Sequence, residues 1–305
     1  MNSRSTRRLL LPLLVVLAGA LACGLPAQEV APQEIIIEPT VRPTLSDAAL
    51  ATLAPEAQST APPLPTAAIA AGPGPGQIIL RQPFAIVLAY SGPESGAGSA
   101  LFTPLQQAAQ KAIEDHGPVH GFGVNLVSFD DNCTEAGGAA VAQQIAADER
   151  VVAVLGPACS KAVQGALPVL ENANVVMLSG AATIPGLSAH GPSVFHRSLL
   201  DDDVAHALGY PSQIYIEDFP GVQAWLGAFA AWGGQLLETG LNHFAPYQYD
   251  ATGILLRALD QTAALQSDGT LVIDRQALRE AVRGTSNYPG VTGAITFEAD
   301  GDRAP

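Results

Sequence analysis

The sequence is poor in basic residues, in aromatic residues and in recognisable catalytic motifs. Only 14% of the 305 residues are charged and 6% are aromatic, and 14 Lys and Arg stand against 28 Asp and Glu. Such an acidic chain argues against binding to nucleic acid or to anionic membrane surfaces, because both depend on basic residues. The chain also has no G-x-S-x-G elbow, no Walker A loop and no G-x-G-x-x-G after a predicted strand.

The six histidines form no metal-binding pattern. None has the HExxH or HxH spacing that a metal would need. His116 and His120 fall in a turn with Gly and Pro after a predicted helix, which indicates solvated surface positions. We therefore expect no metal, no cofactor and no enzymatic activity. The other histidines are His190, His196, His206 and His243.

Carboxylates cluster at three places, which are Asp130 with Asp131, Asp201 to Asp203, and Asp300 with Asp302. Paired acids can carry out acid and base catalysis when they are buried. These acids follow predicted strands or lie in turns, so we expect solvated or helix-capping roles for them.

The first 22 residues predict an export signal. Three arginines precede an apolar run from Leu9 to Ala22, which is too short to span a bilayer and is followed at once by Cys23. The residues before Cys23 resemble the lipobox of bacterial lipoproteins, so Cys23 is expected to carry a lipid anchor. The alternative is a plain signal peptide that leaves Cys23 as an ordinary thiol. Removal of the three arginines would take the formal net charge from −14 to about −17.

Cysteine is also scarce, with three in the chain. If Cys23 carries lipid, Cys133 and Cys159 are left with each other, and an oxidising compartment favours a disulfide between them. A metal site is the competing interpretation, and it lacks nearby Cys or His at ligand spacing.

Proline is concentrated near the N-terminus. Residues 24–76 hold ten of the 24 prolines, with Ala and Thr between them and no sustained periodic pattern. We therefore expect residues 23–77, which begin with Cys23, to form an extended or disordered linker, and we expect the globular part at 78–305.

Between Phe84 and Leu178 short β-rich runs alternate with segments of helix length. In the first helix Leu101, Leu105, Ala109, Ala112 and Ile113 recur at spacings of three and four, which predicts one apolar face. This order predicts an α/β fold, a doubly wound parallel sheet with helices on both faces. The expected strands are 84–89, 124–129, 151–155 and 175–178, and the expected helices are 100–115, 134–147 and 161–171.

The C-terminal part adds three expected helices, at 222–232, 247–265 and 274–283, and a strand at 293–297. The helix at 222–232 carries Trp225, Phe229 and Trp232, for which core packing is the simpler interpretation and a contact surface the alternative.

Four loops follow the carboxyl ends of the expected strands, where open parallel sheets bind ligands. They are 90–98, 130–134, 156–160 and 179–185. The third leads directly into a helix, whose first amides from Ser160 could hold a carboxylate. Ser160 could equally be an N-cap.

These loops carry motifs that resemble the solute-binding proteins of branched-chain amino-acid (Leu, Ile, Val) ABC transporters, which have the type I periplasmic-binding-protein fold. The resemblance extends over nearly everything from Phe84 to Asp302. The motifs are Ser91 to Pro93, Phe129 to Cys133, Gly156 to Ser160, Met177 to Pro185, Val194 to Arg197, Pro246 to Ala251, Gly290 to Glu298, and Gly301 with Asp302.

The resemblance implies that Ser160, Ala181 and Thr183 contact the α-carboxylate and α-ammonium of an amino acid, and that Cys133 pairs with Cys159. The first loop of the family helps to hold the ligand, whereas here Glu94 to Gly98 is small and acidic. The family also implies an ABC transporter permease as partner and a place in the cell envelope.

The chain departs from the family by an absence. Family members cross to a second lobe after the strand near Arg197, but here only Asp201 to Pro211 separates that strand from the C-terminal helices. We expect a single lobe, built from 78–203 and 212–305. An envelope interaction or sensing module, or a decayed copy without ligand binding, is the alternative to a shortened transport protein.

Overall fold

The computed structural model describes residues 70–71, 76–96, 99–190, 194–208, 221–237 and 244–305. The expected export signal, Cys23, most of the linker and His243 lie outside these residues, as does the end of the expected bridge between Asp201 and Pro211.

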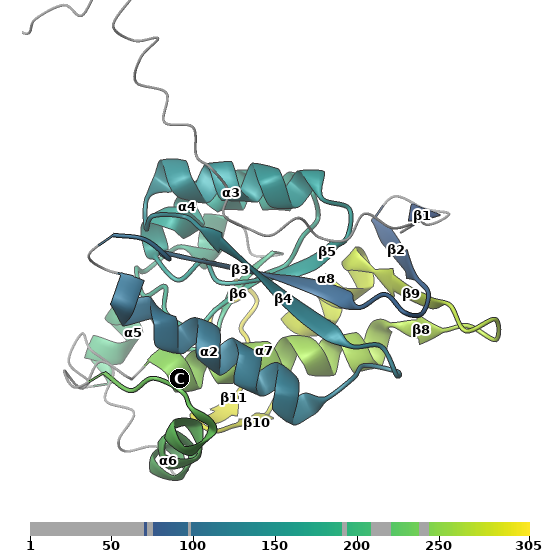
Figure 1. The fold of residues 1–305 in the computed structure, drawn as a ribbon. Coiled ribbons are helices and arrows are strands. Elements are labelled where there is room, and N and C mark those ends of the chain that lie inside the picture. The colour runs from purple at the N-terminus through teal and green to yellow at the C-terminus, as the bar shows by residue number, and fades with distance from the viewer. Residues whose placement is uncertain (1–69, 72–75, 97–98, 191–193, 209–220, 238–243) are drawn as a thin grey trace, which may run out of the picture. The chain divides into compact units, whose positions relative to one another are not determined.

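A five-stranded parallel sheet forms the centre, with the order β4-β3-β5-β6-β7 (Figure 1). The expected doubly wound α/β sheet is therefore confirmed. Each residue of β5 is fully buried, as expected for a parallel strand covered on both faces. The strands are β3 (Ile86–Gly92), β4 (Val124–Asp130), β5 (Val151–Leu155), β6 (Met177–Ser179) and β7 (Phe195–Arg197).

Two pairs of helices cover the two faces of this sheet. Helices α2 (Ser99–His116) and α7 (Phe244–Thr262) pack on one face, and α3 (Glu135–Ala147) and α4 (Ser160–Asn172) pack on the other (Figure 1). From β3 the chain adds β4 on one side of the sheet, and it then adds β5, β6 and β7 on the other side. Because each crossover is right-handed, the helices that connect strands in the two directions lie on opposite faces. The reversal places a topological switch point at the carboxyl ends of those two strands.

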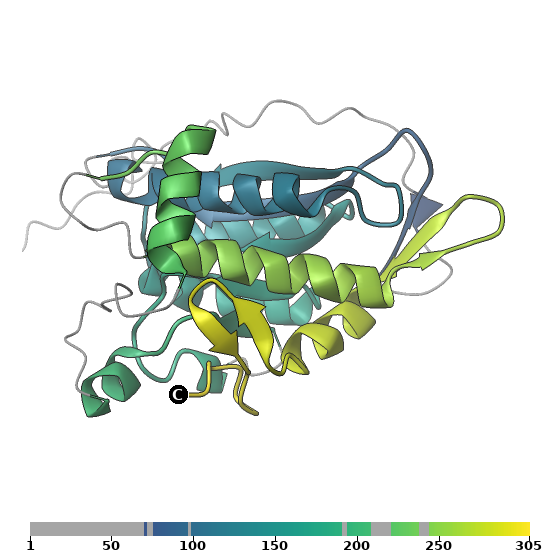
Figure 2. The same cartoon turned by 90° about the horizontal axis from the view of Figure 1, so that it is seen from below.

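Two small antiparallel sheets were not predicted. One has the order β1-β2-β9-β8, and the other pairs β10 with β11 (Figure 2). Helix α8 (Arg275–Arg283) follows β9 and is capped by Asp274. The strands are β1 (Ala70–Ala71), β2 (Gln77–Leu80), β8 (Ala264–Leu265), β9 (Leu271–Asp274), β10 (Tyr288–Gly290) and β11 (Gly293–Ile295).

These strands correct three expectations. The linker was expected to reach residue 77, but β1 and Gln77 pair with neighbouring strands, which bury Ile78 and Leu80. The helix expected over 247–265 begins at Phe244 and ends at Thr262, because Leu265 pairs with Leu271 in a hairpin. The strand expected over 293–297 ends at Ile295.

The expected apolar face of α2 is confirmed except at its start. Leu105, Ala109, Ala112 and Ile113 are buried, whereas Leu101 is 41% exposed. The fully buried stretch of the helix begins at Pro104, so Leu101 in the first turn stays exposed, while Phe102 beside it is partly buried against the core.

Shorter elements follow β7. Helix α5 (Asp202–Ala207) comes directly after it, and α6 (Val222–Trp232) has the bounds expected from the sequence. Trp225 and Phe229 are buried against α2 and α7, which confirms core packing for them. A 3-10 turn, η1 (Ser188–His190), lies between β6 and β7. No helix in the described part of the chain is long and apolar enough to cross a bilayer.

Candidate functional site

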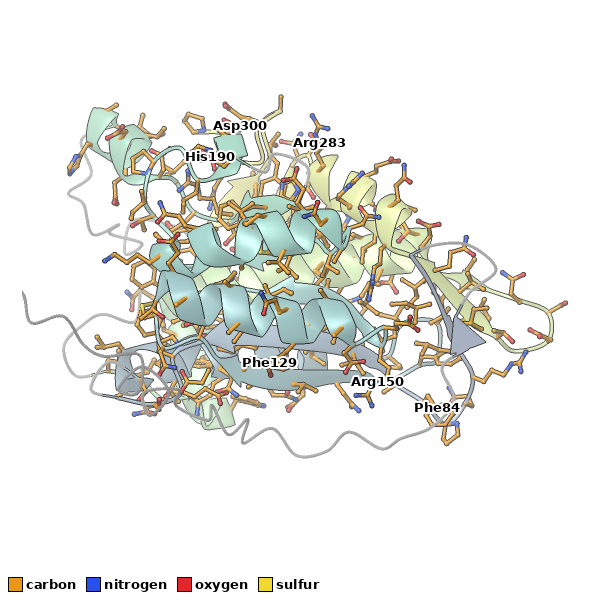
Figure 3. All side chains as sticks on the ribbon, turned by 90° about the horizontal axis from the view of Figure 1, so that it is seen from above. Phe84, Phe129, Arg150, His190, Arg283 and Asp300 are labelled. Carbon is orange, nitrogen blue, oxygen red and sulfur yellow. A yellow bond between two sulfur atoms is a disulfide. The ribbon has the colours of Figure 1, made fainter. Side chains whose placement is uncertain are left out.

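The four loops expected to build a site meet at the carboxyl edge of the parallel sheet, opposite the edge where Phe84 and Arg150 precede β3 and β5 (Figure 3). Ser91, at the switch point, joins two of these loops to the end of β3. Its carbonyl accepts a hydrogen bond from the Ala158 N–H at 3.0 Å, and its hydroxyl donates to Asp131 at 2.7 Å. The first three loops are therefore held together by one residue.

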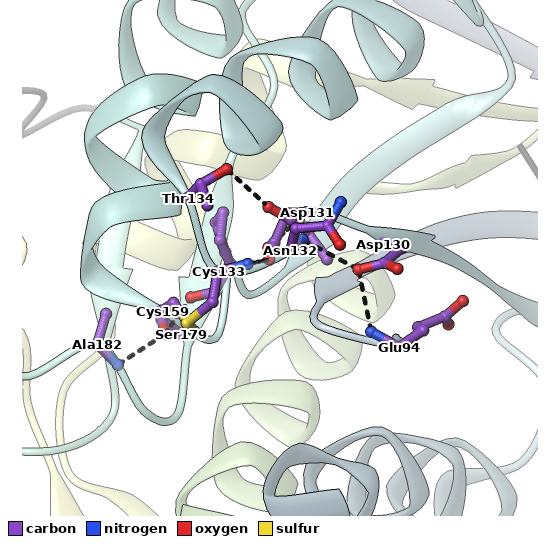
Figure 4. The surroundings of a disulfide bond; sticks show 11 residues. Glu94, Asp130, Asp131, Asn132, Cys133, Thr134, Cys159, Ser179 and Ala182 are labelled. Atoms are coloured by element: carbon purple, nitrogen blue, oxygen red, sulfur yellow. Dashed lines mark hydrogen bonds between the residues drawn. A yellow bond between two sulfur atoms is a disulfide. The ribbon is translucent and has the colours of Figure 1, made fainter. Parts of the chain in front are cut away.

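A disulfide joins the second and third loops (Figure 4). The Cα atoms of Cys133 and Cys159 lie 5.2 Å apart, within the usual range for a disulfide. Cys133 directly precedes Thr134, whose hydroxyl caps α3 by accepting the Gly137 N–H at 2.9 Å. Cys159 is itself the N-cap residue of α4. The covalent link therefore fixes the starts of the two helices relative to each other.

The paired carboxylates are less solvated than expected. The side chain of Asp131 is fully buried, where it accepts hydrogen bonds from the Ser91 hydroxyl and the Cys133 N–H. Burial raises the pKa of Asp131, although these hydrogen bonds act against the rise. For Asp130 burial also favours the neutral form, but hydrogen bonds from Ser95 and from backbone N–H groups outweigh it and lower the pKa.

The other two acidic clusters also carry structural roles. Asp201 is buried and caps α5 by accepting the Val204 N–H at 2.8 Å, as a capping role predicts. Asp302 forms an ion pair with Arg197, so the solvated role expected for it is wrong. The turn that contains Asp302 brings the carboxylate to a buried cation, and no local pattern shows this.

Ser160 is the first residue of α4, and the N-cap role considered for it falls to Cys159. The Ser160 hydroxyl oxygen instead accepts the Ile184 N–H at 3.3 Å. The first intrahelical hydrogen bond of α4 runs from the Val163 N–H to the Cys159 carbonyl, so the amides of residues 160–162 precede it. Such amides, at the positive end of the helix dipole, favour an anion.

Ala181 and Thr183 lie in the loop after β6. The Ala181 N–H is already bonded to the Ser179 hydroxyl at 3.3 Å, and the Thr183 carbonyl accepts the Asp202 N–H at 3.0 Å. Within the described residues, the Ala181 carbonyl and the Thr183 hydroxyl make no hydrogen bond. Together with the amides of α4, these groups can bind a carboxylate and an ammonium.

Two residues that support this loop were missed as functional candidates. Arg197 is fully buried and donates to the carbonyls of Ala182 and Ile184. Gln248, on α7, is also fully buried and accepts the Gly180 N–H at 3.1 Å. Both lie in the segments that resemble family motifs, and a charged side chain within a short buried strand is the signal that could have singled out Arg197.

Ser160 and Thr183 are partly exposed, and Ala181 is 8% exposed. A cavity of about 460 Å³ lies beside α4 and is lined by residues that include Gln164, Leu167 and His190, but not by Ser160, Ala181 or Thr183. Within the described ranges no group of three or more His, Cys, Asp or Glu side chains could hold a metal ion. The arrangement of amides, carbonyls and hydroxyls suits binding of a small zwitterion.

The fold and these loops define the class of the protein, a lobe of the type I periplasmic-binding-protein fold. Residues 85–214 match the family model described as periplasmic binding protein. Among curated proteins it is 34% identical over 120 residues to the Leu/Ile/Val-binding protein of Escherichia coli K12. It is also 28% identical over 121 residues to an amino acid binding protein of Pseudomonas aeruginosa.

Each of these two matches covers 39% of this chain and 32% of the relative, so the matched part spans about one third of the relatives' length. Solved structures confirm the fold. A leucine binding protein from Thermotoga maritima superposes with a TM-score of 0.59 at 16% identity, covering 72% of this chain and 93% of that one. A putative branched-chain amino acid ABC transporter protein from Rhodospirillum rubrum gives the same TM-score at 17% identity, covering 72% and 95%.

Proposed function

We propose that the chain is an exported, lipid-anchored solute-binding protein of the branched-chain amino-acid transporter type, in a shortened one-lobe form. Cys23 would carry the lipid, an ABC transporter permease would be the partner, and the cell envelope would be the location. The ligand would be an amino acid or a related solute. No enzymatic step is part of this proposal.

One observation supports the proposal most directly: the start of α4 lies next to the loop after β6. The hydrogen bond from Ile184 to Ser160 brings Thr183 next to the positive end of α4. The amides at the start of α4 then suit the α-carboxylate, and the Ala181 carbonyl with the Thr183 hydroxyl suits the α-ammonium.

A single lobe implies weak binding. A small ligand in a full site has 70 to 90% of its surface buried, and one wall leaves much of that surface in water. If a complete cleft gives a micromolar dissociation constant, about −8 kcal/mol, loss of half the contacts leaves a dissociation constant of about 1 mM or more.

Isothermal titration of the purified chain with L-leucine, L-isoleucine and L-valine, up to tens of millimolar, tests the proposal. We expect saturable heat in the millimolar range. Thr183→Val removes the free hydroxyl at nearly constant volume and is expected to weaken binding by about tenfold, the value of a hydrogen bond to a charged group. Thr262→Val, at the far end of α7, is the matched control. Absence of heat with all three amino acids would refute binding of branched-chain amino acids.

A second candidate function is association with a protein partner, favoured by the apolar side chains exposed after the ends of the parallel strands. Leu101, Ile184 and Leu208 are 41%, 41% and 52% exposed and follow β3, β6 and β7. Sedimentation velocity tests whether the partner is a second copy of this chain. A protein that stays monomeric at all concentrations and also binds amino acids supports solute binding, whereas a dimer that forms with increasing concentration supports association.

A further inference from the structure

The side chain of Arg197 is fully buried, and each of its five N–H groups donates a hydrogen bond. Its Nε donates to Asp302 Oδ1 at 2.5 Å, and Nη2 donates to Asp302 Oδ2 at 2.7 Å and to Asp201 at 3.3 Å. Nη1 donates to the carbonyls of Ala182 and Ile184, at 3.3 and 2.9 Å. A planar guanidinium with fixed donors can hold such a set, whereas an ammonium cannot.

The two carbonyls that Arg197 holds lie on either side of Thr183. Restraint of the residues before and after it fixes the backbone from which the Thr183 hydroxyl projects. The Thr183 carbonyl is held as well, by the Asp202 N–H at the start of α5. The loop therefore depends on β7 and on the residues that follow it.

The guanidinium is itself held by a turn near the C-terminus. Asp302 accepts from Arg197 and also from the Ser188 hydroxyl of η1. The turn lies close against β7, since a Cβ at Gly301 would lie 2.3 Å from the Phe195 carbonyl oxygen. Figure 3 shows His190 of η1 beside Asp300, in agreement with the contact between Ser188 and Asp302.

We propose that Arg197, held by Asp302, is the positioning residue of the ligand site and sets the orientation of the loop that carries Ala181 and Thr183. This inference rests on the function proposed above, because it assigns a role in that same site. Arg197 does not touch the ligand. Loss of the ion pair between Arg197 and Asp302 leaves Ala181 and Thr183 unchanged, but the loop that carries them becomes less ordered. The ligand must then order that loop on binding, which weakens its affinity.

Arg197→Lys in the whole chain tests the inference, with Arg275→Lys as the matched control. Arg275 is 8% exposed and donates to the carbonyls of Val151 and Glu149, at the opposite edge of the sheet. Asp302→Asn is the second variant. It retains the volume of the side chain and loses the ion pair, so it decides the question if Arg197→Lys does not fold.

The first readout is hydrogen exchange of the Ile184 and Asp202 amides, which report the loop directly and need no ligand. We expect at least tenfold faster exchange in Arg197→Lys and Asp302→Asn, and no change at these amides in Arg275→Lys. The second readout is titration with L-leucine, with at least fivefold weaker binding in the two site variants and unchanged binding in the control.

Unchanged exchange and unchanged L-leucine affinity in both site variants would overturn the inference. Equal changes in Arg275→Lys would also overturn it, because they would show a general loss of stability. If the wild-type chain binds none of the three amino acids, the proposed function fails, and the exchange comparison still decides whether Arg197 orders the loop.

Discussion

The contact between α3 and α4 is the feature that a single substitution tests most directly. The two helices approach so closely that glycines face the backbone of the neighbouring helix. A Cβ added at Gly165 would lie 1.9 Å from the Glu135 carbonyl oxygen, and one at Gly138 would lie 2.1 Å from that of Ala162. Because real Cβ atoms essentially never come closer than 3.0 Å, Gly165→Ala requires the helices to separate by about 1 Å.

The expected magnitude follows from two opposing effects. Alanine is favoured over glycine within a helix by about 1 kcal/mol. Overpacking of a close contact costs about 1 to 3 kcal/mol, and the upper value applies here because backbone atoms of a packed helix must move. Gly165→Ala is therefore expected to lower the free energy of unfolding by about 2 kcal/mol.

Gly227→Ala in α6 is the matched control, because a Cβ there has no atom within 4 Å. It is expected to raise the free energy of unfolding by up to about 1 kcal/mol. Urea unfolding followed by far-ultraviolet circular dichroism measures both. A difference between the two variants of less than about 1 kcal/mol would refute the close helix contact, since about 3 kcal/mol is expected.

Two further predictions concern the loops of the site. Burial raises the pKa of Asp131 in the folded state, so stability is expected to fall as pH rises above about 4 through that raised pKa. Asp131→Asn should weaken this fall, as urea unfolding at a series of pH values between 4 and 8 would show, and an unchanged slope would contradict it. Replacement of both Cys133 and Cys159 by Ser opens a loop with a separation of 26 residues and should cost about 3 to 4 kcal/mol in unfolding free energy. Reduction of the wild-type protein should cost the same amount, and a loss below about 1 kcal/mol would contradict the link.

The central sheet and its helices could be predicted because their patterns are local. The apolar run 151–155 and the segment 222–232 have the bounds of β5 and α6. Alternation of strand and helix also predicted that the sheet is parallel and that the four loops lie at its carboxyl edge, but it did not predict the order of the strands. The helix expected over 161–171 corresponds to α4, which begins one residue earlier at Ser160, and it was predictable for the same reason, since a strand, a short loop and a helix follow one another there.

The features that were missed depend on residues far apart in the sequence. Gln77 pairs with Asp274, and Arg197 pairs with Asp302 across 105 residues, so neither contact shows in a local pattern. Asp131 was expected to be solvated because loop acids usually are, but Ser91, 40 residues away, supplies the hydrogen bond that permits its burial.

The site loops are positioned by contacts within the described lobe alone. Ser91 and the disulfide hold the first three loops, the Ser179 hydroxyl donates to the Pro157 carbonyl at 2.8 Å, and Gln248 and Arg197 hold the fourth. A loop that is already ordered costs less to bind, so under the proposed function these contacts would help the polar groups near Ser160 and Thr183 to hold an amino-acid head group. If the protein has the proposed one-lobe form, the side chain of the ligand would face solvent, and the protein should distinguish leucine, isoleucine and valine only weakly.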